Sequence, residues 1–162
     1  MDTKDFRGVA LNPYYEFSVE VPLSNYGVRF EDYQKAFQAG FRRAHRYWDG
    51  IEDVTVVSET PTLLVRRLHF GGGASATDCI EGSGERFTHW ILDTEGKVHG
   101  RNEITLERNG EDARVTHVCS LVPSAKLPDE RIEAIREKAY RAKDEAFALG
   151  VLADLLEERD RH

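Results

Sequence analysis

Residues 98–122, VHGRNEITLERNGEDARVTHVCSLV, carry the clearest structural signal in the chain. Apolar and polar residues alternate on both sides of Asn109-Gly110, which predicts two strands joined by a tight hairpin turn. A two-residue turn at Asn109-Gly110 pairs Asn102 with His117 and places both on one face with Ile104. A slip of one residue would mix the apolar and charged faces, so the apolar pattern selects this register.

Similar patterns upstream predict four more strands in the middle of the chain and one near its start. Alternation predicts the first strand over residues 14–21. The six strands of the middle region are predicted at 52–59, 62–70, 74–80, 86–93, 98–107 and 113–122. Short turn sequences such as Gly82-Ser83-Gly84 separate them, and such turns join neighbouring antiparallel strands. The sheet is therefore predicted to be an antiparallel meander.

Helical periodicity occurs in two places only. Aromatic residues from Phe30 to Trp48 predict one helix, or two short helices if Gly40 interrupts it. A long helix is predicted from Pro128 to near the C-terminus. Its predicted inner stripe consists of Ile132, Ile135, Ala139, Ala142, Ala146, Leu149, Ala153 and Leu156. Small residues there either let the sheet pack closely or leave a cavity, and both alternatives stand.

The predicted fold class is α+β, with a seven-stranded antiparallel curved sheet around a long C-terminal helix and one or two short helices after the first strand. The chain has 162 residues, which suits a single domain over 1–162, and residues 1–13 are expected to form a flexible N-terminal segment. No run of about 20 apolar residues and no signal-like segment occurs, so we expect a cytoplasmic protein without membrane insertion. The net charge of −7 disfavours nucleic acid as a partner.

The predicted inner wall holds a polar couple, Asn102 and His117, among apolar residues. Burying either without a partner costs about 1–3 kcal/mol. They can satisfy each other, or they can bind a ligand carbonyl or hydroxyl, in which case His117 can also act as an acid or base. The turn at residues 93–97 can adopt two geometries, and they place different residues of the preceding strand beside Asn102. A Glu95-Gly96 turn places His89 inward, whereas a type I turn with a bulge at Gly96 places Trp90 inward and is slightly favoured.

Arg66 and Arg67 are adjacent on a strand, so one of them points inward or toward the sheet edge. An inward arginine can meet an acidic ligand or pair with a buried carboxylate. The spacing of histidines and of the two cysteines matches no metal motif, and the glycine-rich turns match no phosphate loop. We therefore expect no metal and no cofactor, and we expect Cys79 and Cys119 to be buried, reduced thiols.

Four stretches resemble a known group of proteins: residues 17–22 (FSVEVP), 64–71 (LVRRLHFG), 102–104 (NEI) and the Ala139-Tyr140 pair. Together with the element order, they resemble the START-like superfamily, also called SRPBCC or helix-grip, and within it the AtaL-like group. The resemblance implies a deep hydrophobic cavity between sheet and helix, without cofactor or metal. It does not supply a reaction, because lipid carriers, receptors and polyketide cyclases share this scaffold.

The predicted function is binding of a small hydrophobic, partly polar molecule, aromatic or polyketide- or lipid-like, in a cavity of several hundred Å³. The candidate ligand-binding residues are Asn102, His117, Trp90, His89, Ile104, Arg66, Ala139, Ala142 and Ala146. A first alternative is an enzyme of the cyclase or dehydratase type, with His117 as the catalytic acid or base. A second is a protein-interaction module or homodimer without a ligand, anchored by Tyr47 and Trp48.

Overall fold

The computed structural model describes residues 1–122 and 130–161. The strands are β1 (Asn12–Val21), β2 (Ile51–Thr60), β3 (Leu63–Phe70), β4 (Ser75–Ser83), β5 (Arg86–Leu92), β6 (Val98–Asn109) and β7 (Asp112–Leu121). The helices are η1 (Thr3–Gly8), η2 (Ser24–Tyr26), α1 (Phe30–Gly40), η3 (Phe41–Arg46), η4 (Gly71–Gly73) and α2 (Glu130–Asp160), the η elements being 3-10 helices. Pro128, the predicted first turn of the long helix, lies outside the described residues.

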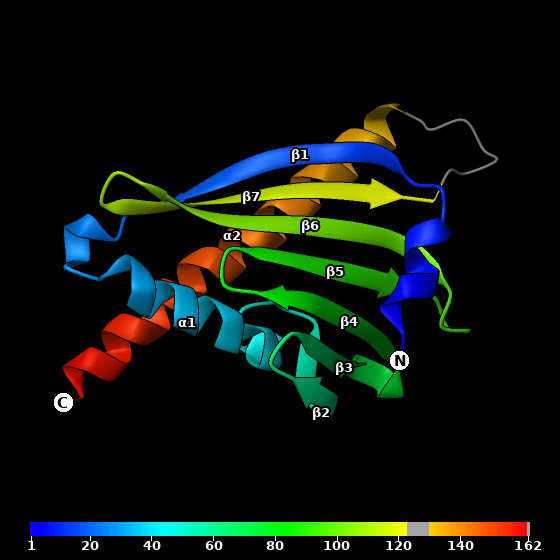
Figure 1. Cartoon of the computed structure of the whole chain (residues 1–162), viewed down its shortest axis with the longest axis horizontal. Coiled ribbons are helices and arrows are strands. Elements are labelled where there is room, and N and C mark those ends of the chain that lie inside the picture. Colours follow the sequence, from blue (N-terminus) through cyan, green and yellow to red (C-terminus); the bar gives the residue numbers. More distant parts are fainter. Residues whose placement is uncertain (123–129, 162) are drawn as a thin grey trace.

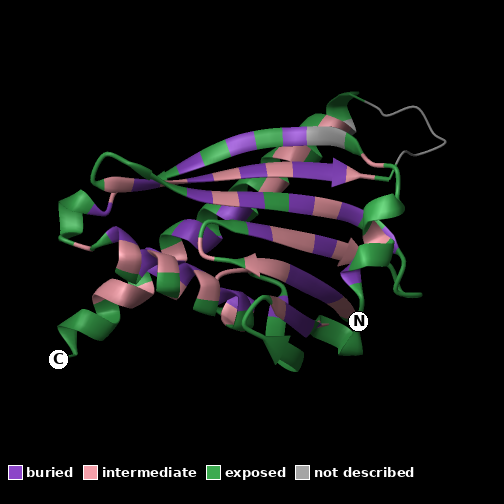
Figure 2. Ribbon diagram, in the orientation of Figure 1, coloured by how far each residue is buried: buried purple, intermediate pink, exposed green. Residues whose placement is uncertain are grey.

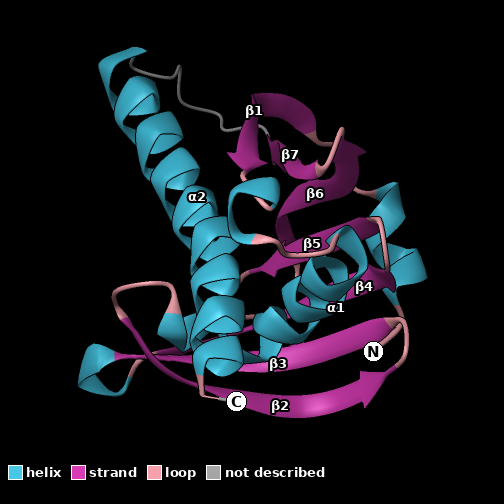
Figure 3. Ribbon diagram, turned by 90° about the vertical axis from the view of Figure 1, so that its left-hand side faces the viewer, coloured by secondary structure: helices cyan, strands magenta, loops and turns pink. Residues whose placement is uncertain are grey.

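The strands form one seven-stranded antiparallel sheet in the order β1-β7-β6-β5-β4-β3-β2. It curls around α2, and α1 lies on the same face beside the helix (Figures 1 and 3). The predicted α+β fold class is confirmed, including the break of the first helical segment near Gly40. A Cβ at Gly40 would lie 3.0 Å from Val151 Cγ2, so this position lets α1 approach α2 closely. No helix in the described ranges is long and apolar enough to cross a membrane.

The β6–β7 hairpin differs from its predicted register by two residues. Asn109 pairs with Asp112, and Gly110-Glu111 form the turn, with Gly110 at a φ of 64° that glycine adopts without strain. Asn102 therefore lies opposite Cys119 rather than His117. Because side chains alternate with a period of two, a shift of two leaves the faces unchanged, and Asn102 and His117 both remain on the inner face. Buried and more exposed positions alternate along the strands of the sheet (Figure 2).

The β5–β6 connection corrects the choice between His89 and Trp90. The turn has the favoured geometry, because the Asp93 amide donates to the Lys97 carbonyl (2.8 Å) and Gly96 has a φ of 81°. A second irregularity then follows, since Ile91 pairs with Gly100 but Leu92 pairs with Val98. The extra residue in β6 exchanges the two faces of β5 once more. His89 rather than Trp90 therefore lies on the inner face, where it pairs with Asn102.

Trp90 consequently faces the outer side of the sheet. Its ring lies 5.5 Å from that of Phe6 and packs with Val65, Cys79 and Leu92. Phe6 belongs to η1, which lies across this outer side near the N-terminus (Figure 1). Residues 3–8 of the segment predicted to be flexible thus form a helix whose Phe6 covers a tryptophan that would otherwise be exposed, and the flexibility of residues 1–13 stays a prediction.

The predicted inner stripe of α2 is also wrong, except at Leu156, which is half-buried and packs against the core. Ile135 is 69% exposed, and Ala139, Ala142, Ala146, Leu149 and Ala153 are exposed too, while the side chain of Ile132 is outside the description. The buried face instead carries Asp144, Phe147, Ala148, Val151 and Leu152. Large side chains release more free energy on burial than alanine does, so the face containing Phe147 packs against the sheet. Phe147 lies 5.2 Å from both Phe37 and Phe41, ring centre to ring centre.

Candidate ligand cavity

A cavity of about 210 Å³ lies between the inner face of the sheet and α2. Its apolar wall includes Phe37, Phe41, Ile91, Ile104, Tyr140 and Phe147. Its polar wall consists of Arg66, Asp78, His89, Asn102, His117, Lys143 and Asp144. Apart from Lys143, these polar side chains form two separate clusters. The clusters differ in how many of their polar atoms have hydrogen-bond partners.

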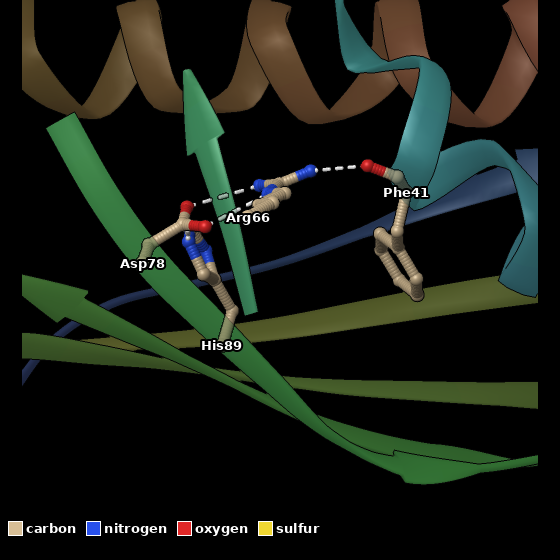
Figure 4. A network of polar contacts seen from close by, with 4 residues as sticks. All are labelled: Phe41, Arg66, Asp78 and His89. Carbon is tan, nitrogen blue, oxygen red and sulfur yellow. Dashed lines mark hydrogen bonds and ion pairs between the residues drawn. The ribbon is translucent and has the colours of Figure 1, made fainter. Parts of the chain in front are cut away.

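The first cluster, here called the Arg66 network, joins β3, β4, β5 and the first residue of η3 (Figure 4). Arg66 Nε and Nη2 donate to the two carboxylate oxygens of Asp78 at 2.8 and 3.1 Å, and Nη1 donates to the Phe41 carbonyl at 2.6 Å. His89 Nε2 lies 2.6 Å from Asp78 Oδ2. Burial alone would raise the pKa of Asp78, but the charges of Arg66 and His89 outweigh it and hold that pKa well below its usual range. The Asp78 carboxylate is thus the shared partner of Arg66 and His89.

The second cluster, here called the His117 cluster, joins β6, β7 and α2. His117 Nδ1 lies 3.4 Å from Asn102 Nδ2 and 3.3 Å from Asp144 Oδ2. The exposed fractions are 8% for Asn102, 2% for His117 and 8% for Asp144. The His117 ring also stacks on Phe17, with 5.2 Å between ring centres. Among the described residues, neither Asn102 Oδ1 nor His117 Nε2 has a hydrogen-bond partner.

Burial sets the protonation of the His117 cluster. It lowers the pKa of His117 to about 3, with a smaller contribution from the nearby His89 charge. It raises the pKa of Asp144 to about 7, and the Lys143 charge opposes that rise. The imidazole is therefore neutral at neutral pH, while the Asp144 carboxyl group is close to half protonated.

The proton on Asp144 determines what His117 presents. A protonated Asp144 can donate to Nδ1, and Nε2 then carries the hydrogen as a donor. An ionised Asp144 accepts from Nδ1–H, and Nε2 is then an acceptor. Buried groups with shifted pKa values next to a cavity are typical of functional sites.

Lys143 and Trp48 form the rim of the cavity. The Trp48 indole nitrogen donates to the Lys143 carbonyl (2.8 Å), and the Lys143 ammonium lies 4.3 Å from the centre of the Trp48 ring. Partial burial lowers the pKa of Lys143, although the residue remains exposed to solvent on its outer side. Both residues also line an open outer pocket, which Ala142 and Ala146 border.

The cavity brings together five of the predicted ligand-binding residues: Asn102, His117, His89, Ile104 and Arg66. Trp90 is on the other side of the sheet, Ala142 and Ala146 border the outer pocket, and Ala139 is exposed. The role of each toward a ligand stays a prediction. Arg66 is paired with a buried carboxylate, one of the two alternatives considered for it.

Sequence reasoning missed Asp78, Lys143 and Asp144. Asp144 precedes Phe147 and Ala148 by one helical turn, so a correct choice of the buried face of α2 would have found it. Asp78 lies on a strand directly opposite Arg66, a pairing that requires the register of β3 and β4. Within residues 1–122 and 130–161, no group of three or more His, Cys, Asp or Glu side chains is placed to hold a metal ion. Cys79 and Cys119 are buried free thiols.

Tyr47 and Trp48, the anchors predicted for a partner, are half-buried and engaged within the molecule, and their role toward a partner stays a prediction. The Tyr47 hydroxyl donates to Asp154 at 2.6 Å, and both aromatic rings pack against Phe147. The homodimer itself stays a prediction.

Comparison with solved structures identifies the fold. The aromatase/cyclase Zhui from Streptomyces sp. R1128 aligns with a TM-score of 0.63 and 15% identity, covering 93% of this chain and 96% of that one. A START superfamily protein from Mycobacterium smegmatis gives 0.61 and 10%, covering 87% and 97%. Ara h 8.0201 gives 0.59 and 14%, covering 89% and 99%.

The chain therefore has the START-like helix-grip fold, as the sequence predicted. Identities of 10–15% show the fold alone. No protein-family model and no curated protein sequence matches this chain. Assignment to the AtaL-like group stays a prediction.

Proposed function

We propose that the protein binds a compact, hydrophobic and partly polar molecule in the cavity between the sheet and α2. The observation that carries this proposal is the incomplete hydrogen bonding of the His117 cluster. Two buried polar atoms that have no hydrogen-bond partner within the described ranges, Asn102 Oδ1 and His117 Nε2, belong to side chains that line the cavity wall. Each such group costs about 1–3 kcal/mol when unsatisfied, and a ligand that bonds to it recovers part of that free energy.

The cavity volume favours the smallest of the expected ligands. Cavities on the order of 150 Å³ accept benzene, and drug-sized pockets run from about 300 Å³ upward. At about 210 Å³, this cavity suits one substituted aromatic ring better than a multi-ring polyketide or a long acyl chain. The apolar side chains contact the ring, and the polar atoms of Asn102 and His117 orient it.

Thermal shift measurements test this proposal with a panel running from single-ring aromatic compounds to larger polyketides, fatty acids and sterols. A ligand at about 100 times its dissociation constant adds roughly 2.7 kcal/mol, which raises the melting temperature of a domain of this size by about 5–10 °C. We expect single-ring compounds to give this rise, Asn102→Ala to halve it or more, and the exposed control Asn25→Ala to preserve it. If no compound shifts the melting temperature, the proposal is wrong.

A second candidate function is acid–base catalysis of the cyclase or dehydratase type. The contact between His117 Nδ1 and Asp144 favours it, because a carboxyl group that orients an imidazole is a common arrangement in catalytic sites. The aromatase/cyclase with a similar fold also supports it by analogy. A short linear polyketone, followed by the absorbance of an aromatic product, provides the test. His117→Ala should abolish product formation while the substrate still binds, and equal loss of both would argue for binding alone.

A further inference from the structure

The charges on the cavity wall are unevenly distributed. Arg66 and Asp78 neutralise each other through two hydrogen bonds, and His89 shares the same carboxylate. This leaves Lys143 and Asp144 as the remaining charged positions. Asp144 contacts His117 and is close to half protonated at neutral pH. Lys143 forms no ion pair with any described carboxylate, and Asp144 and Asp78 act on its charge only at longer range, so among the described residues it is the cavity cation without a directly bound counter-ion.

The position of Lys143 makes this cation available to a ligand. Its ammonium lies 4.3 Å from the Trp48 ring centre, and the Trp48 indole bonds to its carbonyl, so the two residues fix each other at the rim. Lys143 lines both the cavity and the open outer pocket. Asn102 and His117, in contrast, lie at buried positions of the wall.

We propose that the ligand is a single-ring aromatic acid whose carboxylate pairs with Lys143 at the rim and whose second polar group, a hydroxyl, bonds to Asn102 and His117. This inference rests on the proposed binding function. A hydroxyl both donates and accepts, so it matches an unpartnered amide oxygen and either tautomer of His117. The ring between the two polar ends contacts the aromatic side chains of Phe41, Tyr140 and Phe147.

The opposite charge fits the wall less well. A ligand ammonium would face the like charge of Lys143, because the Asp78 carboxylate is already bonded to Arg66 and His89. A ligand carboxylate meets instead the Lys143 ammonium, which has no directly bound carboxylate among the described residues, and Asp144 accommodates it by keeping its proton, which its burial already favours. The structure therefore discriminates between ligands of the same shape by their charge.

Three probes that share a ring and a hydroxyl test the inference: 4-hydroxybenzoate, 4-hydroxybenzyl alcohol and 4-hydroxybenzylamine. Calorimetric titration at pH 7 should give the acid an affinity about fivefold to tenfold above the alcohol, as expected for one partly solvated charge-assisted contact. The amine should bind most weakly. Lys143→Gln should remove the preference for the acid while changing the affinity for the alcohol less than about twofold.

Two further variants control this result. Lys138→Gln removes the same charge from an exposed position of α2 and should behave like the wild type. Lys143→Arg keeps the charge and should keep the preference for the acid. Equal affinities for acid and alcohol, or tightest binding of the amine, would overturn the inference while leaving the binding function intact. The same holds if only larger aromatic compounds bind, whereas failure of every compound would refute both proposals.

Discussion

The Arg66 network and the His117 cluster are both buried polar groups on the wall of one cavity, yet they differ in completeness. Every charge in the Arg66 network has a partner of opposite charge or a backbone carbonyl at 2.6–3.1 Å. The contacts of His117 Nδ1 are longer, at 3.3 and 3.4 Å, and two atoms of the cluster lack partners in the part of the chain that the structure describes. The comparison shows that burial of polar groups does not by itself distinguish the two clusters, whereas incomplete hydrogen bonding on the cavity wall is found, among the described residues, in the His117 cluster.

The two clusters also connect different parts of the fold. The Arg66 network links three neighbouring strands, β3, β4 and β5, to the carbonyl of Phe41. The His117 cluster links the sheet to α2 across the cavity. We infer that the first holds the sheet and η3 together and that the second is available to a ligand.

The largest expected effect is on the Arg66 network. Arg66→Met leaves the Asp78 carboxylate buried without its arginine, and removing one partner of a buried pair costs about 3–5 kcal/mol. Urea unfolding at pH 7 measures the loss. The neighbouring exposed Arg67→Met should change the free energy of unfolding by no more than about 0.5 kcal/mol. Similar losses in the two variants would contradict a stabilising role for the network.

The His117 cluster should contribute much less to stability. The double replacement His117→Leu with Asp144→Leu removes two poorly satisfied polar groups together, and such exchanges are often neutral or stabilising. We expect the free energy of unfolding to change by less than about 1 kcal/mol, with ligand-induced thermal shifts abolished. A loss as large as that of Arg66→Met would show that this cluster is structural instead.

The pH dependence of stability isolates Asp144. Its pKa is raised to about 7, so between about pH 4 and 7 the folded protein keeps a proton that the unfolded chain has lost. Stability from this group therefore falls as the pH rises through that window, by up to about 1.4 kcal/mol per pH unit. Asp144→Asn lacks this loss and should become more stable relative to the wild type from pH 5 to pH 8.

The titratable groups that face Asp144 also contribute to the pH dependence of stability. They are His117 and Cys119 on β7, and Tyr140 and Lys143 on α2. His117 has a lowered pKa, so its contribution falls in the opposite direction, as the pH drops below about 6.5. Both proteins retain His117, so subtracting their unfolding curves leaves mainly the Asp144 contribution. A difference that does not vary with pH would contradict the raised pKa.

The smallest effect is expected on the outer face of α2, which belongs to neither cluster. Ala146 is exposed, so Ala146→Gln should change the free energy of unfolding by no more than about 0.5 kcal/mol. Ala148, two residues along the same helix, is fully buried, and Ala148→Gln should destabilise the protein by at least 1–3 kcal/mol, on the order of overpacking costs. Equal effects of the two replacements would support instead the inner stripe predicted from the sequence, which contains Ala146.

Periodicity predicted the strands, the split first helix, the long last helix and the shared face of Asn102 and His117. It failed where a single extra residue changes the alternation. The bulge beside Gly100 is such a place, and no residue type near it signals a bulge. It also failed on α2, where two apolar stripes compete and the size of Phe147 decides between them. Asp144 was missed for that reason, and the pairing of Arg66 with Asp78 needs a strand register that short turns do not fix.

Nitrogen NMR of the histidine side chains tests most directly whether the His117 cluster, rather than the Arg66 network, binds the ligand. The protein contains six histidines, and His117→Leu and His89→Gln assign the two relevant signals. On addition of the compound that raises the melting temperature most, we predict that the ring nitrogen signals of His117 shift while those of His89 stay close to their positions. A shift of His89 with an unchanged His117 would contradict the assignment of the His117 cluster as the ligand site.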